Sequence, residues 1–170
     1  MLWRIGTMGV SSNFQKAKDS LQSHDIYIKN THCFTHNDFD PKRTDFDNLV
    51  YQFMHVVRGS EVFGVQDEDG SEEHFFKVFV DVGCRFIKEE DKENKDSEPV
   101  AQIEASFCAE YQMLDKEIDE DSLKVFALQN VSYHVWPFWR EHLMNMCNRL
   151  NLPKVALPTM QVKPQNGNTE

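Results

Sequence analysis

Histidines and cysteines are the residues best suited to chemistry in this sequence, because imidazoles and thiolates bind metals and act as acids, bases or nucleophiles. The chain has seven histidines and four cysteines. His32, Cys33 and His36 could approach a metal ion from one strand, where His32 and His36 would share a face. No HExxH motif is present, and no set of histidines and cysteines has zinc-finger spacing. We therefore favour packing or surface roles for them and predict no metal and no cofactor.

The remaining reactive groups give no catalytic pattern. Cys33, Cys84, Cys108 and Cys147 are far apart and contain no CxxC pair, which favours free thiols that pack as small apolar side chains. The motifs GxSxG, GxGxxG and GxxxxGK[ST] are missing. Paired acids at 72–73 and 89–91 have no apolar neighbours that would raise a carboxyl pKa. We predict no catalytic residue and a protein that is not an enzyme.

The composition favours one globular, cytoplasmic domain. Of 170 residues, 40% are hydrophobic and 27% are charged. No apolar run is long enough to cross a bilayer, and the apolar start of the chain lacks the continuous stretch and cleavage site of a signal peptide. The net charge of -10 opposes binding to nucleic acids and to anionic membranes. It suits basic partners, or it simply keeps the protein soluble.

Period-two patterns predict the elements that must position any site. Strands are expected over 26–36, 49–66, 77–87 and 101–113. In the last two, one face is apolar throughout and should be buried. The members of this apolar set are Val78, Val80, Val82, Cys84, Phe86, Ala101, Ile103, Ala105, Phe107, Ala109, Tyr111 and Met113. The charged segment 88–99 should join these two strands as a hairpin.

Helical spacing appears only after the strands. Asp119 or Asp121 can cap a short helix over 122–130. Pro137 fits the first position of a longer amphipathic helix that ends near Leu150, where Asn151 and Pro153 stop it. The predicted fold class is α+β, with a four-stranded antiparallel sheet, a crossover segment and a long helix. Residues 1–24 are predicted to be a flexible or short-helical extension, 25–160 the domain, and 161–170 a disordered tail.

Large apolar side chains are abundant for such a small domain. The chain has 13 Phe, 7 Met and 3 Trp, and WPFW at 136–139 places three aromatic rings at one helix entrance. These rings point in different directions on a helix, so some must face a groove or a partner rather than the core. Met-rich and aromatic surfaces that can repack suit recognition of many apolar peptides.

The segment 136–160 resembles the SecB family of protein-export chaperones. The resemblance lies in the aromatic–Pro–aromatic entrance at 136–138, the pair Arg140-Glu141, Met146 and Arg149 in the helix, and the later prolines. IYIKN at 26–30 is similar to the first strand of the family. The resemblance implies a SecB fold and a homotetramer, built as a dimer of dimers, that binds unfolded client proteins in apolar grooves. It does not imply any cofactor.

The resemblance also implies roles for particular residues. The expected client contacts are Phe126, Val131, Tyr133, Trp136 and Phe138. The expected helix-packing or oligomer contacts are Leu143, Met144, Met146 and Leu150. Glu104 is the position expected to dock on the SecA translocation motor. The other acidic docking positions of the family are Asn30 and Phe34 here, so protection of an antitoxin or another dedicated partner is an alternative to export.

Two further alternatives come from other functional classes. A hot-dog-type acyl-thioesterase also combines an antiparallel sheet with a helix, but its helix comes early and is wrapped by later strands. In this sequence the apolar helix follows the last strand, which disfavours that topology. A plain interaction subunit would instead bind one folded partner and ignore unrelated unfolded chains.

Overall fold

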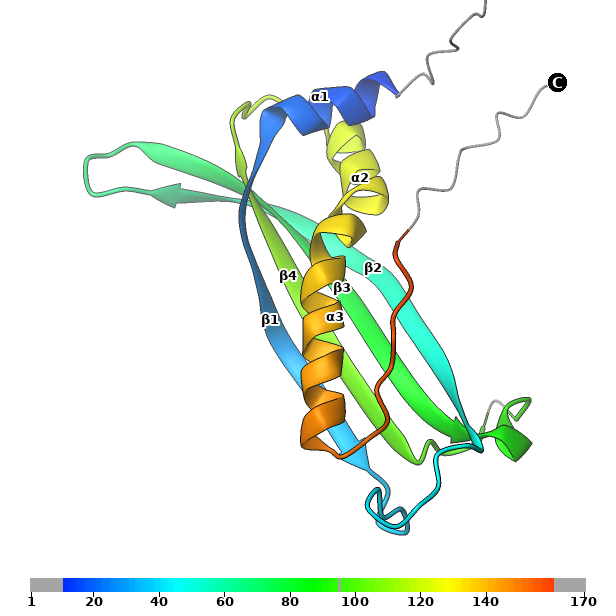
Figure 1. Ribbon diagram of the computed structural model, residues 1–170. Coiled ribbons are helices and arrows are strands. Elements are labelled where there is room, and N and C mark those ends of the chain that lie inside the picture. The colour runs from blue at the N-terminus through cyan, green and yellow to red at the C-terminus, as the bar shows by residue number, and fades with distance from the viewer. Residues whose placement is uncertain (1–10, 95, 161–170) are drawn as a thin grey trace, which may run out of the picture.

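The computed structural model describes residues 11–94 and 96–160. Eight elements follow one another along the described chain (Figure 1). They are α1 (Ser12–Ser20), β1 (Leu21–Thr35), β2 (Leu49–Gln66), β3 (Glu72–Lys88), the 3-10 helix η1 (Glu89–Asp91), β4 (Ala101–Met113), α2 (Glu120–Gln129) and α3 (Val131–Arg149). The predicted disordered tail over 161–170 and the first ten residues lie outside the described part.

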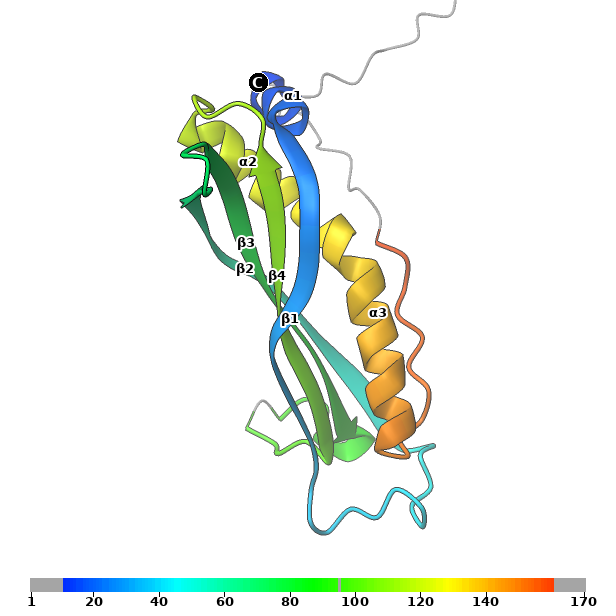
Figure 2. The ribbon, with the colours of Figure 1, turned by 90° about the vertical axis from the view of Figure 1, so that its left-hand side faces the viewer.

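The strands form one antiparallel sheet in the order β1-β4-β3-β2. The first strand therefore pairs with the last, and β1 and β2 are the two edges. Helices α2 and α3 lie on one side of the sheet, which we call the near face, and the opposite side is the far face (Figures 1 and 2). This is the predicted α+β fold, with the sheet followed by a short helical crossover and a long helix.

The core lies between the near face of the central strands and the helices. Each member of the apolar set predicted for β3 and β4 is buried, from Val78 to Met113. The opposite residues of β4 are only partly exposed, and Gln102 and Cys108 are buried. Strand β4 lies between β1 and β3, so side chains of both neighbours shield its far-face residues. These residues are therefore less exposed than an apolar–polar alternation alone predicts.

Pairing across the sheet lengthens two strands beyond their predicted limits. Strand β1 begins at Leu21 rather than at 26, because residues 21–25 pair with the end of β4. Strand β3 begins at Glu72 rather than at 77, so the charged segment that joins it to β2 is only a tight turn over 67–71. Gly70 has φ +85° in that turn and donates its N–H to the Asp67 carbonyl at 3.0 Å.

Helix α2 begins at Glu120, two residues before the predicted start, and Asp119 is the one of the two candidate residues that caps it. The Asp119 Oδ1 atom accepts the Ser122 N–H at 2.8 Å. The other oxygen of Asp119 accepts Lys16 Nζ at 2.7 Å, which ties α1 to the start of α2. These partners hold the pKa of the Asp119 carboxyl far below its usual range.

Helix α3 begins at Val131, six residues before the predicted start, and Pro137 lies inside it. The prediction was wrong because the buried stripe of α3 already begins in the segment before the proline. Side chains at i, i+4, i+8, i+12 and i+16 are all at most 1% exposed, namely Val131, Val135, Trp139, Leu143 and Cys147. Burial of this stripe outweighs the roughly 3 kcal/mol that an interior proline costs.

The chain reverses at the end of α3 and returns along the helix. Asn151 adopts the left-handed conformation, with φ 53°, and the Leu152 N–H reaches the Cys147 carbonyl at 2.9 Å. The following segment, 152–160, which we call the strap, runs beside α3 (Figure 1). Its Pro158 carbonyl accepts Trp136 Nε1 at 2.9 Å. The strap also buries Leu152, Val155 and Leu157.

Candidate functional site

The near face of edge strand β2 is an apolar surface that the helices do not cover. Register places Tyr51 opposite Phe86, Phe53 opposite Cys84 and Val62 opposite Phe76, so all three share the side of the buried core. They are nevertheless exposed, at 38%, 51% and 49%. Helix α3 packs over β1, β4 and β3, which leaves this side of β2 open. We call five near-face residues of β2 the β2 row, of which four are exposed and Val57 is partly buried: Tyr51, Phe53, His55, Val57 and Val62.

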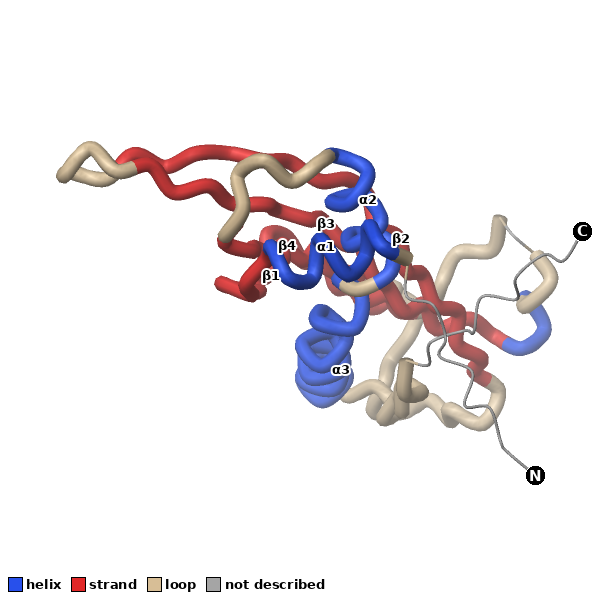
Figure 3. The backbone as a smooth tube through the Cα atoms, turned by 90° about the horizontal axis from the view of Figure 1, so that it is seen from above, coloured by secondary structure: helices blue, strands red, loops and turns tan. Residues whose placement is uncertain are grey.

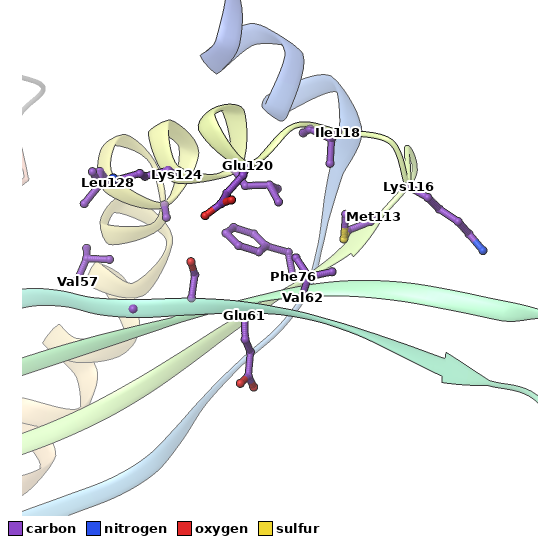
Figure 4. Close-up of a pocket in the computed structure, with 14 residues that line it drawn as sticks. Val57, Glu61, Val62, Phe76, Met113, Lys116, Ile118, Glu120, Lys124 and Leu128 are labelled. Atoms are coloured by element: carbon purple, nitrogen blue, oxygen red, sulfur yellow. The ribbon is translucent and has the colours of Figure 1, made fainter.

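One end of the β2 row opens into a cavity of about 620 Å³ beneath α2 (Figure 4). Its floor comes from β2 and from Phe76 of β3, and its roof from α2. Most of the lining is apolar: Val57, Val62, Phe76, Met113, Ile118, Leu123, Ala127 and Leu128. A cavity of this volume lies within the range of sites that bind small molecules or a few side chains.

Charged residues stand at the margin of the cavity rather than across it. Lys116 donates to the Glu72 carbonyl oxygen at 2.6 Å, which holds its ammonium outside (Figure 4). Figure 4 shows Glu61 directed away beneath β2, whereas the Glu120 carboxylate lies beside Phe76 on the cavity side. Glu120 forms no ion pair with another described residue. Lys124, one turn further along α2, also lines the cavity and forms no ion pair with another described residue. The cavity thus offers an apolar interior with a carboxylate and an ammonium group from α2 at its margin.

The other part of the β2 row lies beside α3. The rings of His55 and Trp136 meet edge to face with centroids 6.2 Å apart. Loss of contact with water lowers the pKa of His55, so its ring is neutral and apolar in character near pH 7. The cavity and this exposed stretch of β2 are continuous along the strand, since Val57 and Val62 belong to both. We call the two together the β2 groove.

The structure separates the predicted client contacts into two groups. Phe126 and Val131 are 2% and 0% exposed and belong to the core, where Phe126 stacks on Phe14 of α1. Tyr133 and Trp136 are half-buried, and Phe138 is exposed. Only the second group is accessible to another chain without movement of a helix, and of these Trp136 borders the β2 groove.

The predicted oligomer contacts divide in a similar way. Leu143 is fully buried under α3, while Met144, Met146 and Leu150 are half-buried. Met146 and Leu150 also pack against the core of the same chain. A second subunit could therefore reach the methionines but not Leu143.

Glu104 lies on the far face, away from the β2 groove. It pairs with His32 of β1, and its Cγ comes so close to Gly83 of β3 that a Cβ there would be only 3.2 Å away. The glycine therefore makes room for the Glu104 side chain, which is partly buried.

Two kinds of reactive group in the described residues bear on catalysis: possible metal-ligand clusters and buried thiols. No group of three or more His, Cys, Asp or Glu side chains in 11–94 and 96–160 is arranged to hold a metal ion. Burial raises the pKa of the Cys84 thiol to about 12, which keeps it protonated and a poor nucleophile. Burial also raises the pKa of Cys108 and Cys147. Among the helices of those ranges, none has both the length and the apolar character needed to cross a bilayer.

The prediction missed the residues that make the β2 groove. Val57, Val62, Leu123 and Leu128 were not singled out, although 49–66 was seen as a long apolar run. Apolar residues occur on both faces of this strand, so the pattern does not distinguish the exposed face from the buried one. The sequence also does not show which parts of the sheet α2 and α3 cover. The available signal was the presence of apolar residues on both faces of 49–66, since a strand at the sheet edge cannot bury all of them within one domain.

Comparison with known proteins gives a match in structure but not in sequence. Neither the protein-family models nor the curated protein sequences match this chain. The SecB-like chaperone Rv1957 of Mycobacterium tuberculosis superposes with a TM-score of 0.63 at 19% identity, covering 89% of this chain and 98% of that one. Its structure was solved with a ChAD peptide from the HigA1 antitoxin. A protein of unknown function from Streptococcus agalactiae matches with a TM-score of only 0.39 at 7% identity, over 81% of this chain and 96% of that one.

The chain therefore has the SecB-like fold that residues 26–30 and 136–160 indicated. The likeness extends over both the sheet and the helices, since it includes nearly nine-tenths of the chain.

Proposed function

We propose that this protein, with its SecB-like fold, is a chaperone that binds unfolded polypeptides in the β2 groove and keeps them from folding or aggregating. The observation that carries the proposal is the row of exposed apolar side chains on the near face of β2, continuous with the cavity under α2. A soluble protein seldom exposes such a row unless a ligand or partner covers it.

The chemistry of the groove suits extended chains. Strand β2 is an edge strand of 18 residues, so backbone N–H and C=O groups along its outer side are free to pair with an added strand. A bound strand would present every second side chain to the near face, where the β2 row and the cavity lie. Such pairing is independent of sequence, and the apolar cavity selects only for size and hydrophobicity.

The expected affinity of one groove is moderate. A buried aromatic side chain removes about 150–250 Å² from water, worth roughly 4–6 kcal/mol at 25 cal/mol per Å² before ordering costs. Ordering a flexible client offsets much of this gain. Grooves on several subunits would act together on one long client, and we propose a homotetramer for that reason. We also propose a cytoplasmic location, as the sequence predicts.

A matched pair of valines tests the site. Val62 and Val56 are 49% and 48% exposed on the same strand, but Val62 lines the cavity and Val56 lies on the far face. We expect Val62→Glu to weaken binding of a labelled unfolded client by at least tenfold, measured by fluorescence anisotropy, because a carboxylate would be buried without a partner. We expect Val56→Glu to leave the affinity within about twofold. Equal losses in both variants would contradict the proposed site.

Protection of a dedicated antitoxin is the second candidate function. It is favoured by the antitoxin peptide bound to the SecB-like chaperone of M. tuberculosis. A dedicated chaperone would bind one segment far more tightly than unrelated unfolded chains, so a competition series with several reduced proteins separates it from a general chaperone.

Delivery of export-competent preproteins to SecA is a more specific task that a general chaperone of this kind could perform. Glu104 is its candidate contact, and Glu104→Gln should then weaken SecA binding without changing client affinity. The likeness in fold alone does not distinguish these tasks, and it leaves an acyl-thioesterase activity to be tested directly with acyl-thioester substrates.

A further inference from the structure

The cavity under α2 is within reach of an apolar segment of the same chain. We propose that residues 1–10 bind in this cavity as an internal competitor of clients. The inference rests on the proposed function, since it gives that site a form of regulation. Three observations carry it: the composition of the segment, the position at which it joins the structure, and a carboxylate at the margin of the cavity.

The segment 1–10 reads MLWRIGTMGV and differs from the rest of the chain. Six of its ten residues are hydrophobic, against 40% of the whole chain, and its only charged side chain is Arg4. Leu2, Trp3 and Ile5 provide large apolar groups of the kind the β2 groove is proposed to take from clients. The other terminal segment, QVKPQNGNTE at 161–170, has Val162 as its only hydrophobic residue and is a poor candidate.

The segment joins the structure next to the cavity. Residue 11 precedes α1, and α1 packs on α2, where Phe14 stacks on Phe126 with ring centroids 6.4 Å apart. Leu123 and Ala127, on the same helix as Phe126, line the cavity. Ten extended residues span up to about 33 Å. This is about three times the diameter of a helix, so the segment can pass around α2 and enter the cavity. Figure 3 shows α1 lying across α2 at this end of the sheet.

One charge at the margin of the cavity, the Glu120 carboxylate, suits the single arginine of the segment, although Lys124 of the same helix also lines the cavity. Glu120 lies on the cavity side of α2 and has no ion-pair partner among the described residues, as noted above (Figure 4). Arg4, between Trp3 and Ile5, would bring a guanidinium to that carboxylate while its neighbours enter the apolar interior. A client with the same arrangement, an arginine flanked by large apolar residues, would compete directly.

The tether makes this competition effective. A segment joined by a few residues has an effective concentration near the millimolar range. If it occupies nine-tenths of the cavities, the apparent client affinity falls about tenfold.

The first test follows Trp3 in the full chain without any client. Its emission is obtained by subtracting the spectrum of Trp3→Phe from that of the wild type, and its exposure is measured by acrylamide quenching. We expect Trp3 to be protected in the wild type and several-fold more quenchable in Leu128→Glu, which places a carboxylate at the cavity wall. Leu128 is 58% exposed, so this variant should fold, as circular dichroism would verify.

The matched control is Leu114→Glu. Leu114 is 61% exposed and does not line the cavity, so its substitution should leave Trp3 protected. Equal quenching of Trp3 in the wild type and both variants would overturn the inference.

The second test measures client affinity. We expect the triple variant Leu2→Ser, Trp3→Ser, Ile5→Ser to bind an unfolded client about tenfold more tightly than the wild type. An unchanged affinity would contradict the competition. A protected Trp3 in a protein that binds no unfolded client would reject the chaperone proposal and keep the internal contact. Normal client binding with an exposed Trp3 would reject the internal contact and keep the chaperone proposal.

Discussion

At the scale of single residues, the end of α3 depends on an asparagine in an unusual conformation. Asn151 is the only described residue other than glycine with positive φ, at 53°. Asparagine tolerates this conformation better than most residues, whereas a β-branched side chain does not. The identity of Asn151 was correctly interpreted from the sequence as a helix stop, since it is followed by Pro153.

Substitution of this residue gives a prediction for stability. Asn151→Val should lower the free energy of unfolding by about 1–2 kcal/mol, because valine is strained in the left-handed region. Asn151→Gly should be neutral or slightly stabilising. Urea unfolding followed by circular dichroism measures both, with Asn148→Val on the exposed side of α3 as control. A valine at 151 as well tolerated as one at 148 would show that the cap contributes nothing.

A second residue-scale prediction concerns the strap. Val155 is 2% exposed, and its neighbour Ala156 is exposed. Val155→Ala should cost about 2 kcal/mol from lost burial and the space left behind. Ala156→Ser should cost almost nothing. If Val155→Ala leaves the urea midpoint unchanged, the strap is not part of the cooperative fold.

At the scale of elements, histidines join α3 to the sheet. His134 Nδ1 lies 2.8 Å from the Tyr111 hydroxyl, and His142 Nε2 lies 3.0 Å from Thr31 Oγ1. Burial lowers the pKa of both histidines below the usual 6.5. The folded state therefore favours the neutral rings, while the unfolded chain takes up protons first as the pH falls.

This gives the sign of a pH effect. The free energy of unfolding should be unaffected by these groups above about pH 7.5 and should decrease as the pH falls through 6.5 towards the lower folded-state values. Urea titrations at several pH values measure the slope, and His142→Gln, which keeps a hydrogen-bonding group, should reduce it. Stability that rises on acidification over this range would contradict the assignment.

Sequence patterns predicted the elements to different extents, for physical reasons. The buried face of β3 and β4 was predicted correctly, although β3 starts five residues earlier than expected, because both strands lie at the centre of the sheet, where one face must be apolar along its whole length. The start of α3 was missed because proline prefers the first position of a helix, which suggested a start at Pro137. Burial of the apolar residues before the proline outweighs this preference, and only the tertiary contacts show that they are buried. The extra length of β1 was missed for a related reason, since its polar residues at 22–25 form a strand only by pairing with β4.

The site was less predictable than the fold. Trp136 was identified from the aromatic cluster and does border the β2 groove. Phe126 was assigned to clients from a resemblance by position, yet it packs in the core against Phe14 and Tyr111. The cavity itself is made by segments far apart in the chain, and a single sequence contains no direct signal for such contacts.

At the scale of the whole molecule, one chain leaves much apolar surface exposed. The near face of β2 is open, and Met54, Val56 and Tyr27 are exposed on the far face. A net charge of -10 on a 170-residue chain opposes self-association through such surface. In the proposed function, clients cover the near face of β2.

Mass in solution tests the central claim most directly, when light scattering is performed with and without a reduced, unfolded client protein. The account predicts about four times the 19.9 kDa chain mass. It also predicts a larger complex with the unfolded client and no change with the same protein in its folded form. A monomer, or an oligomer that ignores unfolded chains, would contradict the chaperone function and favour an interaction subunit with a single folded partner.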